Sequence, residues 1–109
     1  MKYMGMLIFA ILLLSGPEVK ARDGKDVFES LRCGICHKTD NGRINPSLKE
    51  IARAYEGDVD RVMHYFQGEA DPLVNKEKAG IMKRYIEKTK SLADADRKSL
   101  AGFILKHRE

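Results

Sequence analysis

The chain has two cysteines, and both lie in one short motif, Cys33-Gly34-Ile35-Cys36-His37. Two thiols and an imidazole within five residues can serve several chemistries. The thiol pair can form a disulfide, take part in thiol redox exchange or bind zinc, and the three side chains together can attach a c-type haem. The residues around the motif decide between these chemistries.

Thiol exchange of the thioredoxin type expects a buried strand before the motif. Here Val27, Phe28 and Leu31 recur at helical spacing instead. A zinc site needs about four nitrogen or sulfur ligands, and the only further histidines, His64 and His107, are distant in the sequence. A disulfide between cysteines three residues apart closes a very short loop and leaves the histidine unused. Covalent haem attachment uses all three side chains, and the motif favours it.

The spacing of the motif fits this chemistry. Cys33 and Cys36 are three residues apart, so one helical turn can place both sulfurs near two positions on one porphyrin edge, where they form thioethers. His37 follows at once and brings its imidazole under the iron. Gly34 lets the backbone approach the ring, and Ile35 offers an apolar contact to the ring or to the core. We therefore expect one haem c with His37 as an iron ligand.

With this motif, the chain resembles the small bacterial class I cytochromes c, which are single-haem electron carriers. In that family a glycine and, four residues later, an aromatic residue stand on the first helix, and Gly24 and Phe28 match them. The last helix carries leucine and aromatic residues, matched by Leu100 and Phe103. The resemblance spans most of residues 22–109. It implies an all-α fold of short helices wrapped around one haem, with the N- and C-terminal helices crossing.

The resemblance also implies a second iron ligand and a partner for the imidazole. Met82 lies 45 residues after His37, the spacing of the small bacterial members, and it follows a long loop. The prolines that flank the ligand in the family are absent, which predicts a softer ligand loop. In the family a proline carbonyl accepts the other imidazole N–H, and Pro46 matches that proline, with Asn45 in place of the usual glycine.

Other side chains are candidates for the iron or the haem. Met63 falls on the apolar face of an expected helix, which favours a core role, and His64 beside it leaves a bis-histidine haem as an alternative. His107 lies near the C-terminus. A labile or absent Met82 ligand would instead suit a small haem enzyme or a gas-binding protein. Three tyrosines could donate hydrogen bonds to the haem propionates: Tyr55, Tyr65 and Tyr85.

Two helices are expected between the terminal ones. The first follows Pro46 and Ser47, is closed by Gly57, and has one apolar face: Leu48, Ile51, Ala52 and Tyr55. The second follows Asp58 as its N-cap, ends at Gly68, and repeats apolar residues at spacings of three and four: Val59, Val62, Met63 and Phe66.

The remaining segments are expected to be loops and one C-terminal helix. Residues 38–45 and 69–79 are polar and predict loops. The last helix should run from about Asp94 to Lys106. Ala93 cannot cap it, so Asp94 is expected to do so. Its buried residues should be Ala95, Leu100, Phe103 and Ile104.

The N-terminus has the pattern of an export signal. Lys2 precedes an uncharged apolar run over residues 4–14, and Val19-Lys20-Ala21 resembles a cleavage site. As a helix the run would span roughly 16 Å, about half of a hydrocarbon core. We therefore expect a cleaved signal at residues 1–21, a cytochrome c domain at residues 22–109 and a periplasmic location. Retention of the segment, which would tether the domain to a membrane, is the alternative.

Composition limits the functions that remain. The 109 residues suit one small domain and exclude a large multidomain enzyme. Aromatic residues make up only 7% and Trp is absent, so a compact core would be marginal without a filler such as a prosthetic group. The net charge of +4 is too evenly mixed to be typical of a nucleic-acid-binding tail.

The excess positive charge gathers near the expected ligand loop. Between Lys76 and Lys90 there are six basic residues and two acidic ones. Such a basic rim would steer larger redox proteins with acidic docking surfaces. The expected function is therefore a monomeric electron carrier rather than an enzyme, without nucleic-acid partners.

Overall fold

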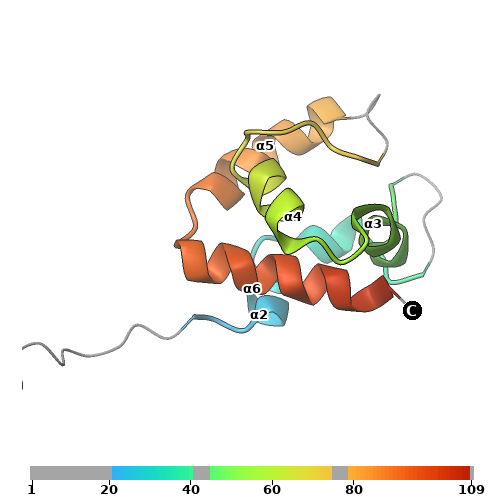
Figure 1. Ribbon diagram of the computed structural model, residues 1–109. Helices are drawn as coiled ribbons and strands as arrows, with labels where there is room; N and C mark the ends of the chain where they lie inside the picture. The colour runs from blue at the N-terminus through green and yellow to red at the C-terminus, as the bar shows by residue number, and fades with distance from the viewer. Residues whose placement is uncertain (1–20, 41–44, 75–78, 109) are drawn as a thin grey trace, which may run out of the picture.

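Figure 1 shows the computed structural model, which describes residues 21–40, 45–74 and 79–108. The described residues form helices and no strand, as the all-α prediction requires. In chain order the elements are α2 (Gly24–Ser30), η1 (Cys33–Ile35), α3 (Leu48–Tyr55), α4 (Val59–Phe66), α5 (Ala79–Lys90), α6 (Asp94–Leu105) and η3 (Lys106–Arg108). The expected export signal lies outside the described residues, except Ala21. In the described part of the chain no helix has the length and apolar character to cross a membrane.

The first described helix, α2, crosses the last α-helix, α6, at a glycine (Figure 1). A Cβ on Gly24 would lie 2.7 Å from the Cβ of Phe103 and would clash with the carbonyl of Ser99. The rings of Phe28 and Phe103 pack at the same crossing, with centroids 5.1 Å apart. The crossing and its aromatic pair, which the family resemblance implied, are confirmed.

The two middle helices begin and end as their sequences predict. The Ser47 hydroxyl accepts a hydrogen bond from the Glu50 N–H, and the Glu50 carboxylate reaches back to the Ser47 backbone, so a capping box starts α3. Gly57 follows the helix with a φ of 75°. The Asp58 carboxylate caps α4 through the Arg61 N–H, and Gly68, with a φ of 76°, follows its end.

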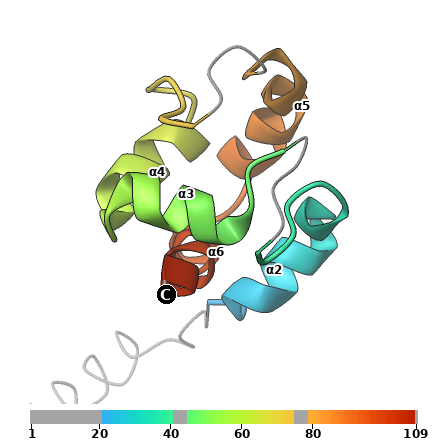
Figure 2. The same ribbon diagram turned by 90° about the vertical axis from the view of Figure 1, so that its right-hand side faces the viewer.

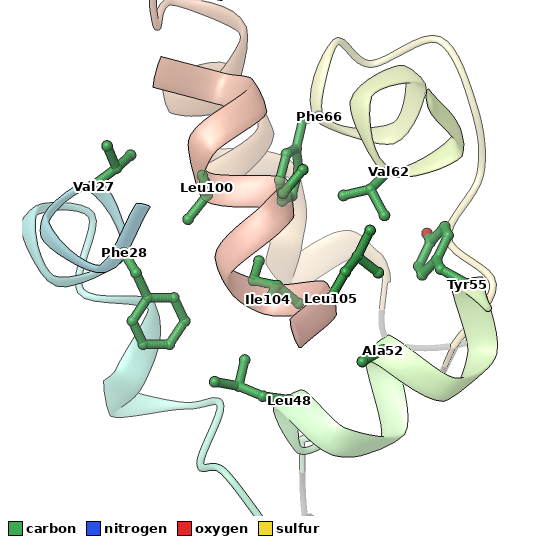
Figure 3. Packing of buried hydrophobic residues seen from close by; sticks show 11 residues of the cluster. Val27, Phe28, Leu48, Ala52, Tyr55, Val62, Phe66, Leu100, Ile104 and Leu105 are labelled. Carbon is green, nitrogen blue, oxygen red and sulfur yellow. The ribbon is translucent and has the colours of Figure 1, made fainter. Parts of the chain in front are cut away.

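These helices share one apolar core with α2 and α6. Figure 3 shows Leu100 and Ile104 of α6 between Phe28 on one side and Val62 and Tyr55 on the other. Leu100 is completely buried, and its helix α6 contacts each of α2, α3 and α4. The core therefore fixes α2, α3 and α4 around the C-terminal helix.

The segment around Met82 differs from the prediction. Met82 lies in the first turn of the twelve-residue helix α5, so the expected ligand loop was wrong at this position. The helix contains no proline that would stop it. Met82, Tyr85 and Thr89 recur at helical spacing and line one pocket, so an apolar face supports the helix.

The start of α6 is a second correction. Ala93 occupies the N-cap position without a side-chain hydrogen bond, and Asp94 is the first helical residue rather than the cap. The Asp94 carboxylate instead lies 3.0 Å from Nη1 of Arg97. Ala95 is exposed, contrary to the prediction, whereas Leu100 and Ile104 are buried. The carboxylate is thus engaged by the next turn of its own helix.

Candidate functional site

All five site residues expected from the sequence line one pocket: Cys33, Cys36, His37, Pro46 and Met82. Its empty volume, the open mouth included, is about 1140 Å³. In Figure 2 the helices surround a central region, and each of the five α-helices contributes residues to the lining. The exposed lining is mostly apolar, as a porphyrin macrocycle requires. Apolar walls, two thiols, an imidazole and a thioether together fit a haem.

A tight turn holds the cysteine motif against this pocket. Arg32 has a left-handed φ of 59° between α2 and the 3-10 turn η1. The backbone N–H of Cys36 and that of His37 both donate to the Cys33 carbonyl, at 3.2 and 2.9 Å. Three functional side chains therefore reach one wall of the pocket from five consecutive residues.

The two residues between the cysteines behave differently. A Cβ on Gly34 would lie 3.2 Å from the Phe28 ring, so the glycine permits close packing of the turn on α2. Ile35 is 66% exposed and does not line the pocket. Of the two contacts expected for Ile35, the one with the core is therefore not made, and the one with the haem ring stays a prediction.

The imidazole of His37 is held by the backbone just before α3. Its Nδ1 lies 2.7 Å from the carbonyl oxygen of Pro46, the residue before the Ser47 cap. A carbonyl can only accept, so Nδ1 carries the proton and Nε2 keeps the free electron pair that a metal requires. The capping box that starts α3 fixes the chain directly after this carbonyl, so the imidazole is oriented by a rigid element.

Of the four candidate second ligands, Met82 alone lines the pocket. Met63 packs against the core, as expected. The imidazole of His64 is exposed, with its Nδ1 2.9 Å from Oε2 of Glu69. His107 Nδ1 donates to the Phe103 carbonyl at 2.8 Å. These contacts do not favour the bis-histidine alternative.

The three tyrosines considered for the propionates all line the pocket. The Tyr55 hydroxyl accepts a hydrogen bond from the Leu73 N–H at 3.4 Å, and burial raises its pKa. Burial also raises the pKa of Tyr65 to about 12. Both phenols are therefore neutral hydrogen-bond donors at ordinary pH.

The environment of Cys33 does not suit thiol chemistry. Burial raises the pKa of its thiol to about 11, although the positive charge of Lys88 opposes this shift. A thiolate is the reactive form in disulfide exchange, and a raised pKa makes it scarce at neutral pH.

Sequence reasoning missed two buried polar residues, Thr89, which lines the pocket, and Arg97, which does not; they are 3% and 7% exposed. The Thr89 hydroxyl donates to the Phe66 carbonyl at 2.7 Å, and the Arg97 guanidinium donates to three carbonyls around the end of α5. One signal was available, because Arg97 shares helical spacing with the buried residues Ala101 and Ile104.

Comparison with known proteins agrees with this site. The Cytochrome c family model matches residues 21–108. The chain is also similar to cytochrome c-551 of Azotobacter vinelandii, with 28% identity over 88 residues that cover 78% of this chain and 98% of the relative. The chain therefore belongs to the cytochrome c family, as a small class I monohaem cytochrome c with one covalently bound haem.

Proposed function

We propose that this chain is an exported electron carrier whose haem iron is bound by His37 and Met82. The observation that carries the proposal is that one apolar pocket is lined by both cysteines, by a histidine with its Nδ1 already engaged, and by a methionine from α5. Cytochrome c-551 is the relative that supports an electron-transfer role.

The residues of the pocket suit transfer of a single electron. When bound, haem c supplies an iron centre that changes oxidation state by one electron. Cys33 and Cys36 hold the macrocycle as thioethers. Nε2 of His37 would bind the iron while the Pro46 carbonyl restrains its ring, and the soft thioether of Met82 would favour reduced iron. The apolar walls exclude water and raise the reduction potential further.

A carrier and a haem enzyme differ in the sixth coordination position. A peroxidase or a gas-binding protein needs that position open for its substrate. Met82 lines the pocket from within a helix, which supports an occupied position and little rearrangement between the two oxidation states. We therefore favour electron transfer over bond-making chemistry.

The partner is proposed to be a larger redox protein with an acidic surface. Exposed basic side chains on α5, Lys83, Arg84 and Lys88, accompany Ile81, which is 60% exposed and lines the pocket. Positive charge around a small apolar area favours fast and weak encounters with an acidic partner. Of the other three basic residues of the predicted rim, Lys90 is exposed at the end of α5, and Lys76 and Lys78 lie outside the described residues.

The periplasm is the proposed location, and it rests on the N-terminal sequence pattern. Intact mass of the exported protein tests it. Cleavage after Ala21 and haem attachment predict a polypeptide beginning at Arg22 with an added mass of about 616 Da. A chain that keeps residues 1–21 would contradict cleavage without affecting the haem assignment.

Carbon monoxide binding and voltammetry test the carrier function on the purified holoprotein. We expect a reversible one-electron response, a six-coordinate low-spin spectrum in both oxidation states and no carbon monoxide complex at neutral pH. A five-coordinate high-spin spectrum with ready carbon monoxide binding would instead support a haem enzyme or a gas-binding protein.

A further inference from the structure

One buried guanidinium, that of Arg97, forms hydrogen bonds with the C-terminal end of α5, the helix that contains Met82. Arg97 lies in α6, and its Nε donates to the Thr89 carbonyl at 2.9 Å. Its Nη2 donates to the carbonyls of Lys90 and Leu92, each at 2.8 Å, and its Nη1 lies 3.0 Å from the Asp94 carboxylate. The last carbonyls of a helix have no partner within the helix. Here the side chain of a neighbouring helix donates to two of them, the carbonyls of Thr89 and Lys90.

A second contact fastens the same end of α5 to α4. The Thr89 hydroxyl donates to the Phe66 carbonyl at 2.7 Å and to the Ile86 carbonyl at 3.0 Å. Ile86 also packs against the core close to this end. By contrast, the charged residues of α5 are exposed. The ion pair between Lys90 and Glu87 lies within the helix and does not join α5 to another element. The hydrogen bonds that join α5 to its neighbouring helices, among the described residues, are therefore concentrated near its C-terminus.

Met82 lies at the opposite end of the helix from this fastening. It precedes Thr89 by seven residues, so the two share a face about 10 Å apart along the axis. A rotation of about 10° at the fastened end would displace Met82 by roughly 2 Å. A metal bond tolerates a displacement of only a few tenths of an ångström. A change in the geometry at Arg97 would therefore be enough to move the thioether out of reach of a bound iron.

We propose that Arg97, assisted by Thr89, is a positioning residue for Met82. The guanidinium sets the tilt and register of α5 against α6, which the α2 crossing and the core hold in place. This inference rests on the proposed function, because it requires Met82 to bind the iron. Loss of the guanidinium should release the thioether more often and open the sixth position to other ligands.

Titration of the oxidised holoprotein with imidazole tests the proposal, since imidazole competes with the thioether for the iron. Met82→Ala gives the affinity of the freed position. We expect Arg97→Gln to bind imidazole about tenfold more tightly than the wild type, and Arg97→Lys to fall between the two. Thr89→Val keeps the side-chain shape and should increase imidazole binding by a smaller factor, so the test does not depend on one variant folding.

Leu105→Ala is the matched control, because Leu105 is buried in α6 and does not line the pocket. It should lower overall stability and leave imidazole affinity unchanged. Wild-type imidazole affinity in both Arg97→Gln and Thr89→Val would overturn the positioning role, and so would equal increases in Arg97→Gln and Leu105→Ala. If Met82→Ala itself does not increase imidazole affinity, the proposed iron ligand is wrong, and this result is distinct from a failure at Arg97.

Discussion

The Nδ1 of His37 donates a hydrogen bond of 2.7 Å to the carbonyl oxygen of Pro46 and thereby joins the cysteine motif to the start of α3. The proposed iron ligand is therefore oriented by a helix that lies later in the chain. A hydrogen bond at this nitrogen increases the electron density that the imidazole gives to a metal. The electronic state of the iron should accordingly depend on the backbone at Pro46.

Pro46→Ala tests this dependence. The substitution keeps the carbonyl but frees its backbone, so the hydrogen bond should weaken and the oxidised iron should lose stabilisation. We expect the reduction potential of the holoprotein to rise by roughly 20–60 mV, measured by spectroelectrochemistry. Pro72→Ala is the control, because Pro72 also lines the pocket. A potential that falls in Pro46→Ala, or that rises equally in both variants, would contradict this account.

The crossing of α2 and α6 predicts opposite effects at two glycines. Gly24→Ala forces a methyl group against Phe103 and the Ser99 carbonyl and should destabilise the holoprotein by roughly 1–3 kcal/mol. Gly102→Ala in α6 meets nothing within 4 Å and should stabilise by about 0.5–1 kcal/mol through helix propensity. Unfolding in guanidinium chloride measures the change in the free energy of unfolding for both variants. Equal effects at the two positions would show that the crossing is not tightly packed.

The basic residues of α5 predict a charge-dependent reaction with small redox reagents. Ferricyanide should oxidise the reduced Lys83→Glu/Lys88→Glu variant several-fold more slowly than the wild type at low salt. The difference should shrink at high ionic strength, because the attraction is then screened. Stopped-flow absorbance measures these rates.

Lys25→Glu/Lys98→Glu is the control for this pair. It makes the same change in net charge at exposed residues that do not line the pocket. Its rate should change less than that of the α5 variant. Equal slowing would mean that overall charge, and not the charge on α5, steers the reagent.

The phenol of Tyr65 predicts a loss of stability in alkali. Burial raises its pKa from 10.0 to about 12, so the unfolded chain releases this proton first as the pH rises. The stabilisation is complete below pH 10 and is lost between about pH 10 and 12. Unfolding free energies measured from pH 8 to 12 should fall less steeply in Tyr65→Phe than in the wild type. A steeper fall in Tyr65→Phe would reverse the predicted sign.

Local signals predicted part of the fold well. The Ser47 and Asp58 caps, together with the glycines at positions 57 and 68, act within one or two turns of chain, and α3 and α4 follow them closely. Gly24 also carried a readable signal, because its partners at the crossing are those that the family resemblance implied. The caps and the glycine turns depend only on residues nearby in the sequence, and the role of Gly24 depends on a helix crossing that the family resemblance already implied. Both kinds of feature can therefore be predicted from the sequence.

The prediction failed where long-range contacts decide the structure. The polar residues 69–79 indicated a loop that leads to Met82, and the helix that begins at Ala79 was not predicted. The end of α5 is stabilised by Arg97, which donates to carbonyls five to eight residues earlier in the chain. It is also stabilised by the Thr89 hydroxyl, which donates to the Phe66 carbonyl in α4. Nothing in the local pattern at either residue indicates these partners. The position of Met82 in the pocket could be expected, but not the helix that carries it.

The near-infrared absorption of the oxidised holoprotein tests the central claim most directly. Iron bound by a histidine and a thioether gives a weak band at about 695 nm. Wild-type protein and the core variant Met63→Ala should both have this band, and Met82→Ala should lack it. Persistence of the band in Met82→Ala, or its absence from the wild type, would contradict iron binding between His37 and Met82.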